Sequence, residues 1–184
     1  MNETLTTIAE RYTCRSFTGT PVKREDLEAI ALAGLQAPTA GNSQRYRLIV
    51  VSDKAMVDEL DEAAVAMFKE NNPQSYERIQ SRGGRAFYNA SAMIIVAIEH
   101  TGPWSAELDC GIVIQNLALA AHSLDIANCI NAMAVALFTG PNGDALKDRM
   151  QFPVGFEFGC AILLGHATDF SQPHVPDMDK IIWL

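Results

Sequence analysis

Two arginines four residues apart form the first arrangement in the sequence that could bind a ligand. Residues 11–17 read Arg-Tyr-Thr-Cys-Arg-Ser-Phe, with the hydroxyl of Thr13 between Arg11 and Arg15. A guanidinium group binds phosphate through paired, charge-assisted hydrogen bonds, and a hydroxyl can add a further donor. Residues 11–24 contain basic and no acidic side chains, although the net charge of the chain is −8. The pattern predicts a small anion site, although arginines at a helix end are more often only solvated.

A second polar segment follows at residues 37–44, which read Ala-Pro-Thr-Ala-Gly-Asn-Ser-Gln. The side chains of Asn42, Ser43 and Gln44 offer amide and hydroxyl groups that could bind a planar heterocycle. The same composition is typical of an ordinary loop between a helix and a strand. Either interpretation fits the sequence by itself.

The sequence contains no self-sufficient set of catalytic side chains. It has no G-x-G-x-x-G after a strand, no phosphate-binding P-loop and no G-x-S-x-G turn, and its four histidines lack the spacing of metal ligands. Cys14, between two arginines, could be a reactive thiol, but a small apolar core residue is the favoured interpretation. If the protein is an enzyme, a cofactor is expected to carry the reaction, and no metal is predicted.

The elements that would position these residues form a mixed α+β pattern rather than a repeated strand–helix–strand unit. Residues 72–85 are expected to be a loop or a short mobile helix. Periodicity and turn residues predict helices over 2–10, 25–36, 53–71, 105–124 and 142–150, with Asp53 as an N-cap, and strands over 46–52, 91–99, 128–131 and 156–165.

The helix predicted over residues 105–124 has few charges and no continuous polar face. A helix that is apolar on most sides must be enclosed, and a second copy of the chain could enclose it. The end of the chain, residues 179–184, is also apolar, and we expect it to be tied down, a role that a partner chain could fill. The sequence therefore favours a homodimer.

Length and composition restrict the class of protein. A chain of 184 residues with 48% hydrophobic and 20% charged residues is expected to form a single domain over 1–184. Its apolar runs are too short to span a bilayer, no signal peptide is visible, and the four cysteines lack disulfide or zinc spacing. We expect a cytoplasmic protein without a membrane partner, and the negative charge argues against binding nucleic acid.

Taken together, the motifs resemble the FMN-dependent nitroreductase family, whose members typically open with Arg-Arg-Ser-x-Arg-x-Phe and continue with Ala-Pro-Ser-x-x-Asn-x-Gln-Pro-Trp. The resemblance covers nearly the whole chain in order. Its matching stretches are RYTCRSF (11–17), APTAGNSQRYRLIVV (37–51), FYNASAMIIVA (87–97), ELDCGIVIQNLALAAHSL (107–124) and PVGFEFGCAILLGHA (153–167).

The resemblance implies a three-layer α/β/α sandwich with a central, mostly antiparallel sheet, in an intertwined homodimer with FMN at the subunit interface. It implies that each flavin is contacted by both chains, the partner contributing the 37–44 segment. The residues carried over are Arg11, Tyr12, Thr13 and Arg15 for the phosphate and ribityl chain, Pro38, Thr39 and Asn42 from the partner, and Ile130 and Asn131 against the flavin ring.

Three departures from the family pattern bear on these assignments. Tyr12 stands where the family has its second arginine, and His174 stands where many members carry a Lys or Arg for the phosphate. Asp125 occupies a position where a glycine usually precedes the flavin-facing segment. Arg82 or Arg85 could supply positive charge near the reduced flavin, or could be solvated loop residues.

The resemblance implies an oxidoreductase that passes hydride from NAD(P)H through FMN to an electrophilic acceptor, a nitroaromatic compound or a quinone. Two alternatives stay open at the level of sequence. The chain could be a flavin-binding or carrier module without efficient turnover, or a flavin enzyme with another reaction, such as dehalogenation or flavin destruction. A fold of this kind supports many reactions.

Overall fold

A four-stranded antiparallel sheet forms the centre of the protein. The computed structural model describes residues 1–101 and 105–184. The strands lie in the order β1-β2-β4-β3, and every neighbouring pair is antiparallel. They comprise β1 (Tyr46–Val51), β2 (Ala92–Glu99), β3 (Ala127–Asn131) and β4 (Phe156–Gly165).

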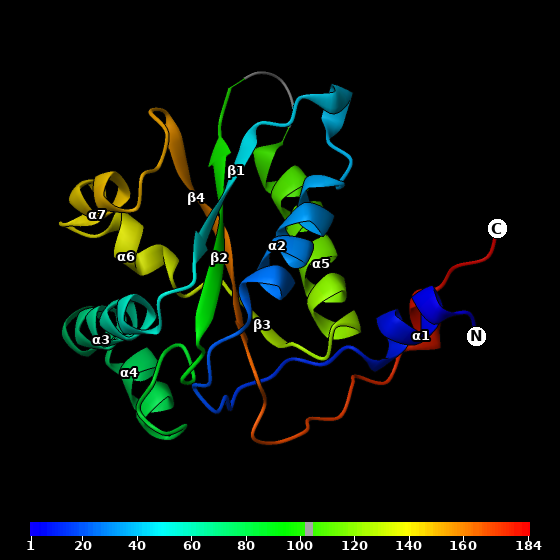
Figure 1. Cartoon of the computed structure of the whole chain (residues 1–184), viewed down its shortest axis with the longest axis horizontal. Helices are drawn as coiled ribbons and strands as arrows, with labels where there is room; N and C mark the ends of the chain where they lie inside the picture. The colour runs from blue at the N-terminus through cyan, green and yellow to red at the C-terminus, as the bar shows by residue number, and fades with distance from the viewer. Residues whose placement is uncertain (102–104) are drawn as a thin grey trace.

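Helices cover both faces of this sheet and make a three-layer sandwich (Figure 1). α2 and α5 lie on one face; α3, α4, α6 and α7 lie on the other, while α1 stands beside the C-terminal end of α5. The predicted layers and antiparallel sheet are confirmed. The helices are α1 (Glu3–Glu10), α2 (Arg24–Leu35), α3 (Lys54–Asn71), α4 (Pro73–Gln80), α5 (Ala106–Ser123), α6 (Val135–Thr139) and α7 (Gly143–Arg149), with short 3-10 turns at Ala40–Asn42 and Met178–Lys180.

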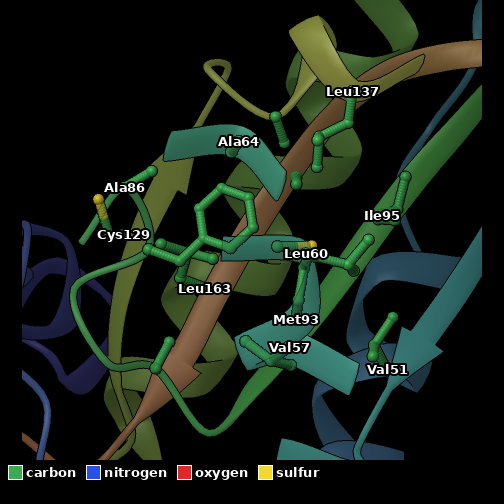
Figure 2. Packing of buried hydrophobic residues seen from close by; sticks show 14 of the residues in the cluster. Val51, Val57, Leu60, Ala64, Ala86, Met93, Ile95, Cys129, Leu137 and Leu163 are labelled. Carbon is green, nitrogen blue, oxygen red and sulfur yellow. The ribbon is translucent and has the colours of Figure 1, made fainter. Parts of the chain in front are cut away.

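Each face of the sheet buries its own hydrophobic core, because alternate side chains of a strand point to opposite sides. Met93 and Ile95 of β2 pack with α3 and α6, while Ile94 and Val96 pack with α2 and α5. Figure 2 shows the first core, where Leu60 of α3 lies beside Met93. β2 is buried on both faces, which explains its uninterrupted apolar sequence.

The sheet contains an irregularity at Gly159 of β4. Val96 pairs with Cys160 and the next residue of β2 pairs with Phe158, so Gly159 is an extra residue without a partner in β2. Phe158 therefore faces the α3 core, although Cys160 packs against the α5 side. A Cβ at Gly159 would lie 2.9 Å from the carbonyl oxygen of Val96 and 2.9 Å from Sγ of Cys110. The missing side chain allows α5 to approach the bulge.

Most element boundaries agree with the sequence prediction to within one or two residues. Asp53 caps α3 as predicted, since its carboxylate accepts a hydrogen bond of 3.0 Å from the amide of Ala55. Of the two options for residues 72–85, the structure shows a short helix, α4, whose first turn is capped by Asn72 and begins with Pro73.

The short helix α6 was not predicted. Its sequence, Val-Ala-Leu-Phe-Thr, is a five-residue apolar run whose periodicity cannot be distinguished from that of a strand. The turn before it is fixed by a tertiary contact, in which the side chain of Asn131 accepts a hydrogen bond of 3.3 Å from the amide of Ala134.

Apolar side chains remain exposed on several elements of the single chain. The end of the chain does not pack on its own fold, since Ile182 is 82% and Trp183 87% exposed. Along α5, the side away from the sheet carries Leu108 at 65% exposure. Exposed apolar residues of the neighbouring helices are Leu5 and Ile8 of α1 and Leu32 and Leu35 of α2. Among the described helices, none is both long and apolar enough to cross a membrane.

Candidate functional site

The predicted anion-binding segment leaves α1 and runs beside β3. The amide of Cys14 donates a hydrogen bond of 2.9 Å to the carbonyl of Asn128, which ties the segment to the first half of β3. Cys14 itself is fully buried, and burial raises the pKa of its thiol. The core interpretation of Cys14 is therefore confirmed. Of its neighbours, Thr13 is half-buried and Arg15 is exposed.

The end of this segment is held by Phe17, which is 3% exposed. Its amide donates to the carbonyl of Tyr88 at 3.1 Å, and the side chain of Asn89 donates to its carbonyl at 3.1 Å. Phe17 also forms a β-bridge with Ala167, just beyond β4. The predicted anion-binding segment is thus fixed between β3, the end of β4 and the loop before β2.

The charge around this segment suits an anion. The Arg15 and Arg11 guanidinium groups lie close enough to Cys129 to lower the pKa of its thiol, although burial has the larger effect and raises that pKa to about 11. Within residues 1–101 and 105–184, Arg11 and Arg15 form no ion pair with a carboxylate. Two uncompensated guanidinium groups beside the half-buried hydroxyl of Thr13 are a donor set that fits a phosphate.

β3 contributes the predicted ring-facing residues from the edge of the sheet. Ile130 is 39% exposed, whereas Asn131 is 4% exposed. The Asn131 side chain donates to the carbonyl of Ala86 at 3.2 Å and accepts from the amide of Ala134 at 3.3 Å. Its amide group is therefore used inside the protein, and Ile130 is the exposed residue of this strand end. β3 pairs with a strand on one side only, and on its other edge the carbonyl of Asn128 is already bonded to Cys14, so the open part of that edge is the end near Ile130.

Asp125, where the family pattern has a glycine, has a backbone conformation that glycine favours. Asp125 has a φ of 57°, in the left-handed region that glycine adopts most easily. Aspartate tolerates this region better than most residues with a side chain. The turn between α5 and β3 therefore keeps a geometry for which glycine is the usual choice.

The positive charge of Arg85 is compensated by carboxylates of α3. Its Nη1 lies 2.7 Å from Oδ1 of Asp58 and 3.7 Å from Oδ2 of the buried Asp61. These two carboxylates compensate the guanidinium, so Arg85 is neither a simple solvated residue nor a free cation for a flavin. Arg82 lies in an exposed turn after α4.

The second predicted segment lies at the other end of α5. The amide of Ala40 donates a hydrogen bond of 3.1 Å to the buried carboxylate of Asp109, in the first turn of that helix. Pro38 is exposed, the hydroxyl of Thr39 accepts from the amide of Gln44 at 3.1 Å, and the Asn42 side chain accepts from the Gln44 amide group at 2.9 Å. The loop is thus a structured turn on the surface.

The structure brings some of the predicted residues together and keeps others apart. Tyr12 packs edge-on against His122 in the last turn of α5, with ring centroids 6.3 Å apart. Asp109, which holds the second segment, is about 20 Å away along the helix axis at about 1.5 Å per residue. Arg11, Tyr12, Thr13, Arg15, Ile130 and Asn131 therefore share one corner of the chain, and Pro38, Thr39 and Asn42 do not reach it.

His174 lies in the C-terminal segment and is exposed. That segment passes Tyr12, whose ring packs on Phe170 with centroids 4.7 Å apart. Cavities of about 470 and 590 Å³ lie elsewhere, beside α2 and between α3 and α7. A site lined from one side by a single chain would not appear as an enclosed cavity in that chain.

Sequence reasoning missed Asp61, which is 4% exposed in the core of α3 and its neighbours. A signal was present, because Asp61 follows Val57 and Leu60 at the spacing of one helix face, and Ala64 continues that face. An acidic residue on an apolar face must be paired or hydrogen-bonded. The partner could not be read from the sequence. No group of histidine, cysteine and acidic side chains in the described residues is arranged to hold a metal ion.

Comparison with known proteins agrees with this geometry. Residues 8–165 match the Nitroreductase family. A solved nitroreductase with bound FMN from Desulfitobacterium hafniense is 45% identical, with a TM-score of 0.94, covering 100% of this chain and 99% of that one. Another with bound FMN, from Bacteroides fragilis, is 26% identical, with a TM-score of 0.89 and full coverage of both chains.

A curated relative from Archaeoglobus fulgidus is provisionally named NADH dehydrogenase/NAD(P)H nitroreductase. It is 27% identical over 176 residues, which cover 92% of this chain and 88% of the relative. The family match, the close structural neighbours and this relative extend over the same elements that hold the candidate site. This chain belongs to the Nitroreductase family.

Proposed function

We propose that the protein is an FMN-dependent oxidoreductase that uses NAD(P)H to reduce an electrophilic acceptor, a nitroaromatic compound or a quinone. When bound, FMN supplies the hydride transfer between the nicotinamide and the acceptor. The observation that carries the proposal is the pair Arg11 and Arg15, uncompensated by carboxylates beside the exposed edge of β3. Support comes from the FMN bound in the two nitroreductases that are 45% and 26% identical. The name of the Archaeoglobus relative supports NAD(P)H as the reductant.

The residues of this chain would hold the phosphate and orient the ring. Arg11 and Arg15 would donate paired hydrogen bonds to the phosphate, with Thr13 as a further donor. Tyr12, where relatives have arginine, packs between His122 and Phe170 and would support the segment by packing rather than by charge. His174, where many relatives carry Lys or Arg, would be the candidate of the C-terminal segment for contact with the phosphate, and that segment passes Tyr12 at Phe170. The exposed side of β3 at Ile130, together with the backbone of Asn131, would lie against the ring.

A second copy of the chain would complete the site with Pro38, Thr39 and Asn42. These residues lie at the far end of α5 from Arg11, so one chain cannot place both groups on one FMN. A homodimer is further supported by the apolar side chains left exposed on α1, α2 and α5 and at the end of the chain. The proposal includes a cytoplasmic location, which the four free thiols support.

The phosphate assignment is tested by the double variant Arg11→Ala/Arg15→Ala. Hydrogen bonds to charged groups contribute about 1.5–3 kcal/mol each, so losing two should weaken FMN binding at least about 100-fold. The matched control is Lys23→Ala/Arg24→Ala, which removes the same charge at the exposed start of α2 and should bind FMN within about twofold of wild type. If the Arg11/Arg15 variant keeps its FMN as tightly as the control, the assignment is wrong.

Turnover is tested by mixing the FMN-loaded protein with NADH or NADPH and then with menadione or nitrofurazone. An oxidoreductase should lose its visible flavin absorbance with one nicotinamide and regain it with the acceptor. Flavin that neither nicotinamide can bleach would refute the reductase proposal and favour a binding module. Sedimentation should give about twice the chain mass of 20.1 kDa. A monomer that retains FMN would contradict the shared site.

A further inference from the structure

The loop between α4 and β2 is held by a buried carboxylate that the proposed function does not use. Asp61 of α3 is 4% exposed, and its Oδ1 accepts a hydrogen bond of 2.7 Å from the amide of Phe87. The amide of Ala86 also lowers the pKa of this carboxyl group. Burial raises the pKa of Asp61, while these two amides and the nearby guanidinium of Arg85 act in the opposite direction. A buried acidic side chain thus binds the backbone of this loop.

The same short stretch is held from its other side by β3. The carbonyl of Ala86 accepts a hydrogen bond of 3.2 Å from the side chain of Asn131. Asp61 therefore binds the N–H group of Phe87, and Asn131 binds the carbonyl of Ala86 in the same peptide unit. Asn131 follows Ile130, the exposed residue of β3 that would face the cofactor. The position of the loop and the position of this strand end are mechanically linked.

The loop also fixes the segment that carries the arginines. The carbonyl of Tyr88 and the side chain of Asn89 bond to the amide and the carbonyl of Phe17. Tyr88 and Asn89 have φ values of 55° and 65°, a conformation that costs free energy in residues with a side chain. Such a loop keeps its shape only while the surrounding contacts enforce it. The hydrogen bond from Phe87 to the buried Asp61 is a contact of this kind.

We propose that Asp61 is a positioning residue for the cofactor site: by holding residues 86 and 87 against Asn131, it fixes both the arginine segment and the end of β3 in the arrangement that binds FMN. This inference rests on the proposed function. Asp61 acts through the loop, to which its hydrogen bond with Phe87 and its ion pair with Arg85 connect it. Its role is distinct from that of Asp58, which pairs with Lys54 and Arg85 at the surface of the same helix.

The amide variant Asp61→Asn separates these roles with little change in shape. A carboxylate has two oxygens that can accept from backbone amides, whereas an asparagine side chain has one oxygen and carries its own N–H groups. We expect Asp61→Asn to raise the FMN dissociation constant about five- to tenfold, measured by flavin fluorescence. Asp58→Asn, the matched control, should stay within about twofold. Asn131→Ala should raise the FMN dissociation constant by a similar factor. Because both side chains act on one stretch of the loop, the double variant should have the same dissociation constant as the single variant that binds FMN less tightly.

The effect of FMN on the free energy of unfolding distinguishes a positioning role of Asp61 from a purely structural one. If Asp61 only stabilises α3, Asp61→Asn lowers the free energy of unfolding equally with and without saturating FMN, and the dissociation constant is unchanged. That outcome would overturn the inference. If the variant does not fold, hydrogen exchange of the wild-type protein decides, because FMN should slow exchange at Phe87 more than at amides of β2. If FMN slows exchange equally at Phe87 and in β2, the role of Asp61 is rejected and the proposed function stands. If the wild-type protein does not bind FMN, both are overturned.

Discussion

At the bulge, the distances around Gly159 predict how a substitution changes the stability of the protein. In Gly159→Ala, the new Cβ would lie 2.9 Å from the carbonyl oxygen of Val96, 2.9 Å from Sγ of Cys110 and 3.0 Å from Cγ2 of Ile98. Ordinary contacts of a Cβ begin near 3.4 Å, so about 0.5 Å of overlap must be relieved. The Val96 oxygen belongs to the backbone of an inner strand and cannot turn away.

Overpacking of a well-packed core costs about 1–3 kcal/mol. A loss of 2 kcal/mol in a chain of this length lowers Tm by about 4–8 °C. The assay is urea unfolding followed by circular dichroism, where we expect a lower midpoint at an unchanged slope. The variant Cys110→Ala provides the internal control, because it removes one of the two closest contacts. Combined with Gly159→Ala, it should recover part of the loss but not all, since the Val96 oxygen remains.

Two results would refute this reasoning. Wild-type stability in Gly159→Ala would mean that the bulge has room for a side chain. Complete recovery in the double variant would mean that the backbone oxygen of Val96 yields easily and that Cys110 alone restricts the site. Either result would remove the argument that α5 and β4 require glycine at this point.

Two further predictions concern a helix cap and the buried thiols. Asp53→Ala removes the cap on the amide of Ala55 and should lower the free energy of unfolding by about 1 kcal/mol in urea titrations, whereas Glu62→Ala on the exposed side of α3 should change it by less than half as much. Burial raises the thiol pKa of Cys110 to about 12 and of Cys129 to about 11, from 9.0. Unfolded thiols ionise first, so stability should fall as pH rises above about 9, by up to about 1.4 kcal/mol per pH unit per thiol. In Cys110→Ala, the free energy of unfolding should fall less steeply with pH above about 9. An equally steep fall would contradict the raised thiol pKa of Cys110.

The elements that the sequence predicted well are those whose pattern is long and unambiguous. The apolar run at 91–99 became the inner strand β2, and the sparsely charged run at 105–124 became α5. α6 was missed because five apolar residues carry too little periodicity to choose a helix over a strand. Its turn is set by Asn131, whose partner is fixed by the tertiary fold.

The candidate site also contains residues that the sequence predicted and residues that it did not. Arg11 and Arg15 were identifiable because their charge stands out in an acidic chain, and the structure places them together beside β3. Asn131 was assigned to the flavin ring through the backbone of its segment, and that assignment stays a prediction; the inward role of its side chain was not foreseen, since residue spacing does not tell which face of a short edge strand is buried. The contact between Asp61 and Phe87 joins residues from two elements, and no local pattern specifies which amide a buried acid will meet.

Under the proposed function, the length of α5 determines how two chains contribute residues to two flavin sites. Each polypeptide contributes one end of the helix to one flavin and the opposite end to the other. A hybrid built from a wild-type chain and an Arg11→Ala/Arg15→Ala chain would then keep one intact flavin site and lose its twin. Separation of the subunits at high dilution would disable both at once, so specific activity would depend on how concentrated the protein is.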